Sequence, residues 1–72
     1  MPSKKNKIYQ KGEVIEALPG PTFRVKLENG QETLAHLAGR LRMYYIKVLP
    51  GDKVVVEFNQ GDFSRGRIVR RE

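Results

Sequence analysis

The stretch that decides the fold of this 72-residue chain is TFRVKLENG, residues 22–30. Its first six residues alternate in polarity, and the apolar ones are Phe23, Val25 and Leu27. This alternation is typical of a strand with one buried face. The Asn-Gly pair follows directly, and both of its residues tolerate the positive φ of a tight hairpin turn. We therefore predict a strand here and a second strand over residues 31–37 that returns antiparallel to it.

The segment before this hairpin predicts a long, bent strand. Apolar residues between positions 8 and 18 do not keep to one side, because Ile8 and Val14 share one parity whereas Tyr9 and Ile15 share the other. A glycine lies in the middle of the run, at position 12. A strand that bends at a glycine, and whose buried face changes along its length, is typical of the corner of a small barrel.

In the segment after the hairpin, the spacing of the apolar residues changes from that of a strand to that of a helix. Four apolar residues recur there at helical spacing, namely Leu37, Leu41, Tyr44 and Val48. We predict one short helix or helical turn over residues 38–45, with Tyr44 in its buried stripe. The Pro-Gly pair that follows is expected to stop this segment.

Two further strands complete an all-β fold. Apolar residues predict a fourth strand over residues 53–59 and a fifth over residues 65–71, with a loop over residues 60–64. Five short strands must protect their edges, and closing into a barrel does so. A helix between the third and fourth strands fits an OB-fold barrel better than an SH3-like barrel. We predict a five-stranded OB-fold barrel with one short helix or helical turn at that place.

The composition fits one small domain that binds an anionic polymer. Residues 1–7 are rich in lysine and predict a flexible basic N-terminal arm, and residues 8–72 are expected to form a single domain. The chain has 14 Lys and Arg against 8 Asp and Glu, a net charge of +6. Clustered cations gain from displacing the counterions around phosphates.

No apolar run approaches the ~20 residues of a membrane span. The basic start is not followed by the apolar segment that a secretory signal needs.

The residues offer no reaction. His36 is the single histidine and the chain has no Cys, and no second ligand lies at metal-binding spacing. Neither serine has a paired base, and phosphate-binding glycine loops do not occur in the sequence. We therefore predict a protein that is not an enzyme and that uses no metal and no cofactor.

The positive charge is concentrated in two segments. Residues 40–47 carry three cations and no acid, and residues 65–72 carry four arginines and one acid. Arginine offers phosphate a planar fork and can stack on a base, and the tyrosines of the first segment add stacking faces. Arginine together with aromatic residues is typical of RNA recognition. A barrel that holds the two segments side by side would present one cationic surface.

Seven short motifs, in their order and spacing, resemble bacterial-type translation initiation factor one over residues 8–71. They are GEV at 12–14, LP at 18–19, FRVKLENG at 23–30, AHL at 35–37, GRLR at 39–42, YIKVLPGD at 45–52 and SRGRIV at 64–69. The cold-shock relatives of the OB fold are a poorer match, because their aromatic-rich runs do not occur in this chain.

The resemblance implies an S1-like OB-fold protein that binds the small ribosomal subunit at the decoding (A) site. Members of the family contact the rRNA of that site and a neighbouring ribosomal protein, and they support the other two initiation factors. We expect a monomer without membrane contact, in the cytoplasm or, for an organellar chain, in the plastid stroma. By motif position, the RNA-binding residues are Arg40, Arg42, Tyr45, Lys47, Arg65, Arg67, Arg70 and Arg71.

Three residues depart from the family's pattern, since Met43 stands where Lys is common, Tyr44 where Asn or His is common, and Arg70 where an aromatic residue is usual.

Two other functions stay open. A general single-stranded RNA-binding or chaperone protein would need an exposed aromatic face, but the core pattern claims Phe23 and Phe58. A protein-interaction adaptor would capture its partner through a barrel edge without RNA.

Overall fold

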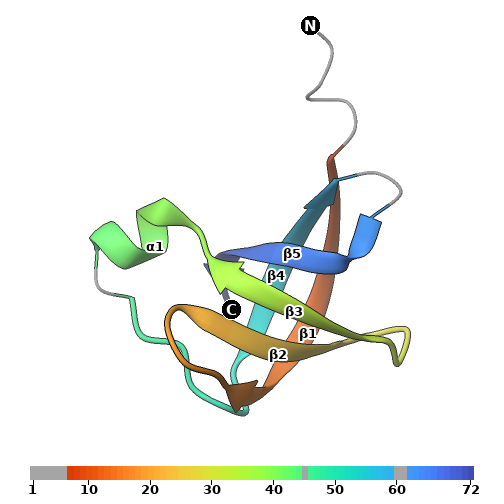
Figure 1. Cartoon of the computed structure of the whole chain (residues 1–72), viewed down its shortest axis with the longest axis horizontal. Helices are drawn as coiled ribbons and strands as arrows, with labels where there is room; N and C mark the ends of the chain where they lie inside the picture. Colours follow the sequence, from red (N-terminus) through yellow and green to blue (C-terminus); the bar gives the residue numbers. More distant parts are fainter. Residues whose placement is uncertain (1–6, 45, 60–61) are drawn as a thin grey trace, which may run out of the picture.

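Five strands and one short helix follow one another in the predicted order in the part of the chain that the structure describes (Figure 1). The computed structural model describes residues 7–44, 46–59 and 62–72. The elements are β1 (Lys7–Ala17), β2 (Thr22–Leu27), β3 (Glu32–Leu37), α1 (Gly39–Met43), β4 (Lys53–Asn59) and β5 (Asp62–Arg71). Lys7, which the sequence assigned to the N-terminal arm, begins β1, and the rest of the predicted arm lies outside the described residues.

The five strands close into a barrel in the order β1-β2-β3-β5-β4. The long β1 joins the two ends of the sheet, because its first half pairs with β4 and its second half pairs with β2. The pair β3–β5 is parallel, and the other four pairs are antiparallel. Closure gives each strand a neighbour on both sides. This arrangement, with α1 between β3 and β4, confirms the predicted OB-fold barrel.

The hairpin between β2 and β3 forms as the alternation and the Asn-Gly pair predict. Gly30 takes a φ of +91°, and its N–H donates to the carbonyl oxygen of Leu27 at 2.8 Å. The side-chain oxygen of Asn29 accepts the N–H of Gln31 at 2.9 Å. The turn therefore places the buried residues of β2 against those of β3.

β1 keeps one buried face from Ile8 to Val14, which corrects the prediction that its buried face changes along its length. The even-numbered residues from 8 to 14 are more buried than their neighbours. The irregularity falls instead between Val14 and Glu16, where the pairing with β2 slips. Gly12 serves a different purpose, because a Cβ at that position would lie 2.7 Å from Cγ1 of Val25. It allows β1 to pass close over β2 at the barrel corner.

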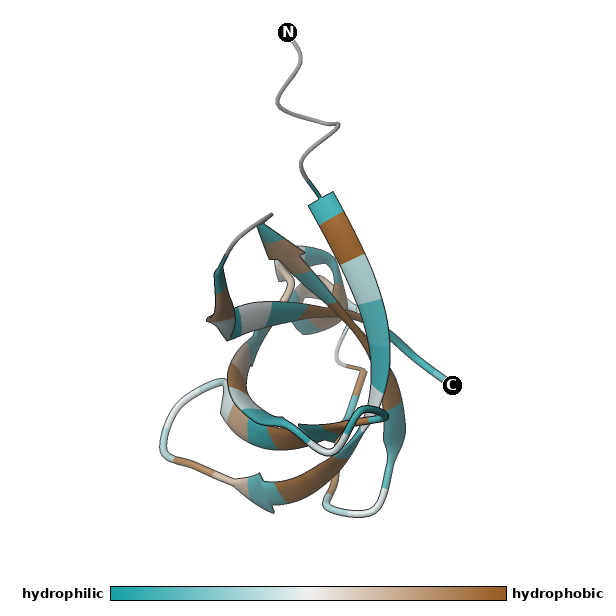
Figure 2. Cartoon of the chain, turned by 90° about the vertical axis from the view of Figure 1, so that its right-hand side faces the viewer, coloured by the Kyte–Doolittle hydropathy of each residue, from teal (hydrophilic) through white to brown (hydrophobic). Residues whose placement is uncertain are grey.

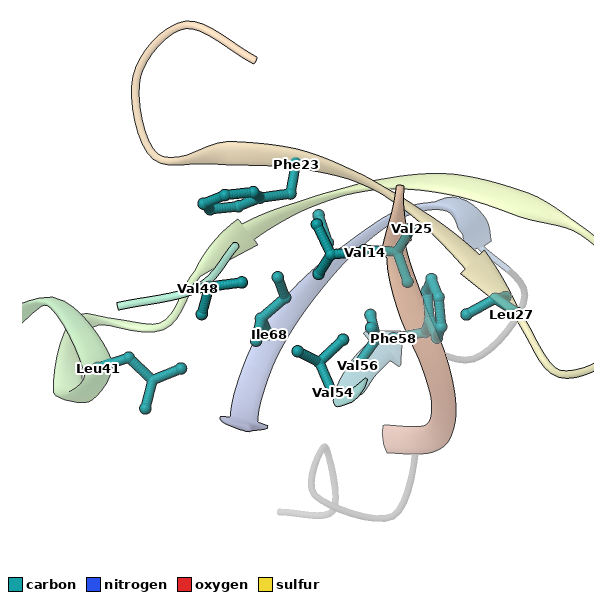
Figure 3. Packing of buried hydrophobic residues seen from close by; sticks show 11 residues of the cluster. Val14, Phe23, Val25, Leu27, Leu41, Val48, Val54, Val56, Phe58 and Ile68 are labelled. Atoms are coloured by element: carbon teal, nitrogen blue, oxygen red, sulfur yellow. The ribbon is translucent and has the colours of Figure 1, made fainter. Parts of the chain in front are cut away.

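The core takes side chains from every strand, from α1 and from the loop after it (Figure 3). Hydrophobic and hydrophilic residues alternate along the strands, as Figure 2 shows. Leu41 of α1 and Val48 of the following loop anchor this region to one end of the barrel. The buried cluster consists of Val14, Phe23, Val25, Leu27, Ala35, Leu41, Val48, Val54, Val56, Phe58 and Ile68.

Tyr44 is 67% exposed, so the prediction that it belongs to the buried stripe is wrong. The helical spacing holds for Leu41, which is buried, but α1 ends at Met43. The backbone of Tyr44 leaves the helical region, with φ −96° and ψ 12°. The chain then turns and returns to the core through Val48, which leaves the tyrosine ring in solvent.

β5 begins at Asp62, three residues before the start that the sequence predicted. The carbonyl oxygen of Phe63 accepts the hydroxyl of Thr33 at 2.9 Å. The ring of Phe63 packs against the ring of Phe58, with centroids 5.1 Å apart. These contacts with β3 and β4 extend the strand into residues 62–64, which the sequence interpreted as a loop.

Candidate nucleic-acid interface

The ends of β3 and β5 bring the two cationic segments together. The two strands run parallel, with Leu37 opposite Ile68. The N–H of Ala38 donates to the carbonyl oxygen of Ile68 at 2.9 Å. Because α1 begins at the next residue, its first turn lies beside the C-terminal half of β5 (Figure 1).

A second contact joins the end of β5 to the loop after α1. Nη1 of Arg71 donates to the carbonyl oxygen of Lys47 at 2.8 Å. Residues 40–47 and residues 65–71 are therefore neighbours in space, although they are far apart in the sequence. We call the surface that they form the α1–β5 face, and its cations are Arg40, Arg42, Lys47, Arg65, Arg67, Arg70 and Arg71.

The cations of the α1–β5 face differ in whether a nearby carboxylate offsets their charge. Two of the arginines have carboxylates beside them, because Arg67 pairs with Glu57 and Nη2 of Arg70 lies 3.6 Å from Oε2 of Glu72. The others are exposed, and no carboxylate of the described residues lies within 4 Å of their charged groups. Tyr45, the eighth residue predicted for the site, lies outside the described residues.

Exposed apolar side chains accompany these cations around α1. Met43 is 68% exposed and Leu49 is 54% exposed, and both lie on the same helix and loop as the exposed Tyr44. A helix and loop with exposed guanidinium and aromatic groups can contact phosphates and stack on bases.

Glu57 is the residue of this region that sequence reasoning missed. Its carboxylate accepts a hydrogen bond from the hydroxyl of Tyr9 at 3.0 Å and another from Nη2 of Arg67. Burial raises the pKa of Glu57, but these hydrogen bonds and the charges of Arg67 and Lys7 outweigh burial, and its pKa is lower than usual. Conversely, the hydrogen bond and the negative charge of Glu57 raise the pKa of Tyr9. The register of three strands creates this cluster, so no local motif could have revealed it.

Charges balance on another part of the outer surface. Glu32, Lys26, Glu13 and Lys53 are opposite one another in register across β3, β2, β1 and β4. All four are exposed, and their signs alternate. Alternating charges cancel beyond about a Debye length, ~8–10 Å. The net charge of +6 is therefore not spread evenly over the barrel, and the arginines of α1 and β5 account for much of it.

Within residues 7–44, 46–59 and 62–72, no group of three or more His, Cys, Asp or Glu side chains is placed to hold a metal ion. The same part of the chain has no helix with the length and apolarity that crossing a membrane requires.

The family model described as translation initiation factor 1A / IF-1 matches residues 1–72 of the chain. This chain belongs to that family. It is thus a translation initiation factor, of a non-enzymatic class that associates with the ribosome. Among solved structures, it is similar to translation initiation factor one from the Wolbachia endosymbiont strain TRS of Brugia malayi. The two share 37% sequence identity and superpose with a TM-score of 0.79, over 99% of this chain and 84% of that one.

Two more distant structures share the fold. YjeQ from Thermotoga maritima superposes with a TM-score of 0.73 at 23% identity, over 90% of this chain and 23% of that one. Eukaryotic translation initiation factor 5A from Methanococcus jannaschii superposes with a TM-score of 0.65 at 15% identity, over 92% and 44% of the two chains. At these identities the similarity concerns the barrel alone.

We expect this initiation factor to lose stability in acid through Glu57. Its folded pKa lies below the ordinary 4.5, so its contribution is fully present above that value and is lost as the pH falls through the folded pKa. In urea unfolding, Glu57→Gln should be less stable than the wild type by about 1 kcal/mol at neutral pH. In acid, at a pH below the folded pKa of Glu57, this difference should nearly vanish. An equal difference at both pH values would contradict the ion pair with Arg67.

Asp62 does not disturb this comparison. Hydrogen bonds from the hydroxyl and the N–H of Ser64 lower the pKa of Asp62, so it also contributes stability that is lost in acid. Both proteins keep Asp62, and the difference between them therefore isolates Glu57.

Proposed function

We propose that this initiation factor binds the small ribosomal subunit at the decoding (A) site, through contacts of the α1–β5 face with rRNA. The observation that carries the proposal is the contact between Arg71 and Lys47, which joins the two cationic segments into one surface. Guanidinium groups provide a planar fork for phosphate oxygens and can stack on bases. A folded RNA surface offers both kinds of group at fixed positions.

The proposed contacts are of two chemical kinds, namely charged contacts with phosphates and stacking on bases. Arg40, Arg42 and Lys47 extend from α1 and the loop after it, and they would contact phosphates together with Arg65 of β5. Tyr44 offers an exposed ring on which an unstacked base could stack, worth roughly 1–3 kcal/mol. Tyr45, Arg67, Arg70 and Arg71 complete the proposed set, in which the resemblance to the family supports Tyr45.

The partners follow from the same resemblance. They are the rRNA of the decoding site, a neighbouring ribosomal protein and the other two initiation factors, which the protein would support as a monomer in the cytoplasm or plastid stroma. The protein would act by occupying the site, and it would need neither catalysis nor a cofactor. The lysine-rich residues before β1 would serve as a basic arm beside the single domain that begins at Lys7.

Comparing two RNA ligands at the same stated salt concentration tests this proposal. We expect isolated small subunits to bind far more tightly than an unstructured RNA such as poly(U). Both affinities should fall with salt, with a log–log slope of roughly −0.7 to −0.9 for each phosphate contact. Equal affinity for the two ligands would instead identify a general single-stranded RNA-binding protein. That alternative needs an exposed aromatic face, but Phe23 and Phe58 are buried, and the exposed aromatic rings among the described residues are those of Tyr9 and Tyr44.

A further inference from the structure

Beside the α1–β5 face, Glu57 of β4 lies between cations. Register places Tyr9, Glu57, Arg67 and His36 in one row across β1, β4, β5 and β3. Tyr9 donates to Oε2 of Glu57 and Arg67 donates to Oε1, so both carboxylate oxygens have a partner. The Glu57 side chain is 10% exposed, whereas the Arg67 side chain is 45% exposed. The guanidinium is thus held on one side and open to solvent on the other.

The row borders a surface pocket of about 240 Å³. Two carboxylates as well as three cations line it, and its charged or titratable lining residues are Lys7, His36, Glu57, Asp62, Arg65 and Arg67. Three cations around one pocket would by themselves attract phosphate. Glu57 neutralises Arg67, and its carboxylate also repels phosphate oxygens. The pocket therefore favours neutral groups that form hydrogen bonds, such as ribose hydroxyls and base edges.

We propose that Glu57 is a specificity-determining residue of the α1–β5 face. Glu57 holds Arg67 as an oriented hydrogen-bond donor, and it keeps the charge of Arg67 from attracting phosphate in any RNA. This inference rests on the proposed function. Non-specific RNA binding comes from charge, whereas a folded RNA surface is also recognised by its shape and by directed hydrogen bonds. Glu57 therefore weakens binding to a single strand more than it weakens binding to the subunit.

The test compares Glu57→Gln with the wild type, on poly(U) and on isolated small subunits over a range of salt concentrations. Glutamine keeps the shape of the side chain and removes its charge, which frees Arg67 for one more phosphate contact. The poly(U) salt slope should become steeper by about 0.7, and poly(U) affinity should rise roughly fivefold at about 0.1 M salt. The preference for the subunit over poly(U) should fall by a similar factor. An unchanged preference would overturn the inference.

Glu13→Gln is the matched control. It removes the same charge from the exposed row of alternating charges, where Glu13 lies opposite Lys26 and Lys53. We expect it to change the preference by less than twofold. If Glu13→Gln and Glu57→Gln lower the preference equally, net charge alone is responsible and the inference is wrong.

Glu57→Asp keeps the inference testable if the glutamine variant fails to fold, which circular dichroism would show. The shorter side chain keeps the charge but cannot reach both Tyr9 and Arg67. Poly(U) affinity should stay the same and subunit affinity should fall several-fold, because Arg67 loses its orientation. Unchanged subunit affinity would contradict the proposed role.

The two proposals fail in different ways. If the wild type itself binds poly(U) and the subunit equally well, the proposed function is wrong. If the wild type prefers the subunit and Glu57→Gln leaves that preference unchanged, the role of Glu57 alone is wrong.

Discussion

Gly66→Ala is expected to lower the free energy of unfolding by about 3 kcal/mol, most of the ~3–5 kcal/mol that a domain of this size without disulfides has. Gly66 lies on the inward side of β5. A Cβ there would lie 2.4 Å from Cγ1 of Val56 and 2.8 Å from a ring carbon of Phe58. Both neighbours are fully buried, so neither can move aside. Urea unfolding, monitored by circular dichroism, measures this loss of stability.

Gly39→Ala is the matched control for this substitution. Gly39 begins α1, and a Cβ there would meet no atom within 4 Å. Alanine also favours the helix over glycine by up to about 1 kcal/mol. We expect the stability of Gly39→Ala to equal or slightly exceed that of the wild type. If Gly66→Ala also unfolds at the wild-type urea concentration, β5 does not pack against β4 as described.

The double substitution Arg40→Ala/Arg65→Ala is expected to weaken subunit binding about 100-fold. It removes one exposed cation from each of the two segments, and neither arginine has a carboxylate partner among the described residues. Loss of two charge-assisted hydrogen bonds costs about 3 kcal/mol in total, which corresponds to that factor. The salt slope should also become shallower by roughly 1.5. Titration of labelled protein with small subunits at several salt concentrations measures both quantities.

Lys26→Ala/Lys53→Ala is the control for net charge. It removes two positive charges from the row in which Lys26 and Lys53 lie on either side of Glu13. The net charge falls by the same amount as in Arg40→Ala/Arg65→Ala, but we expect a loss of affinity of less than about threefold, because neither lysine belongs to the α1–β5 face and exposed charges outside the contact surface are screened by salt. If the two double variants weaken binding equally, the α1–β5 face is not the binding surface.

The sequence was sufficient to predict the strands, because alternation is a local property. Phe23, Val25 and Leu27 share one face as a consequence of backbone geometry alone, and the Asn-Gly turn sets their register against β3. The position of the helix and the need to protect strand edges then predicted a closed barrel. A single cationic surface required residues 40–47 and 65–71 to lie side by side, and the contact between Arg71 and Lys47 brings them together.

The remaining features depend on long-range contacts that a local pattern does not contain. Tyr44 fits a helical stripe, but α1 ends before it because the chain must return to the core. Phe63 belongs to β5 because Thr33 and Phe58 lie beside it. The pairing of Glu57 with Tyr9 and Arg67 needs the register of three strands at once. For this reason the sequence predicted Arg67 as a cation but not the acid that holds it.

Chemical footprinting of small-subunit rRNA, with and without saturating protein, shows whether the protein binds at the decoding site. We expect changed reactivity concentrated in the nucleotides of the decoding site. With Arg40→Ala/Arg65→Ala at the same concentration, these changes should be strongly reduced. Unchanged reactivity at the decoding site, while the wild-type protein is bound elsewhere on the subunit, would contradict the proposed function.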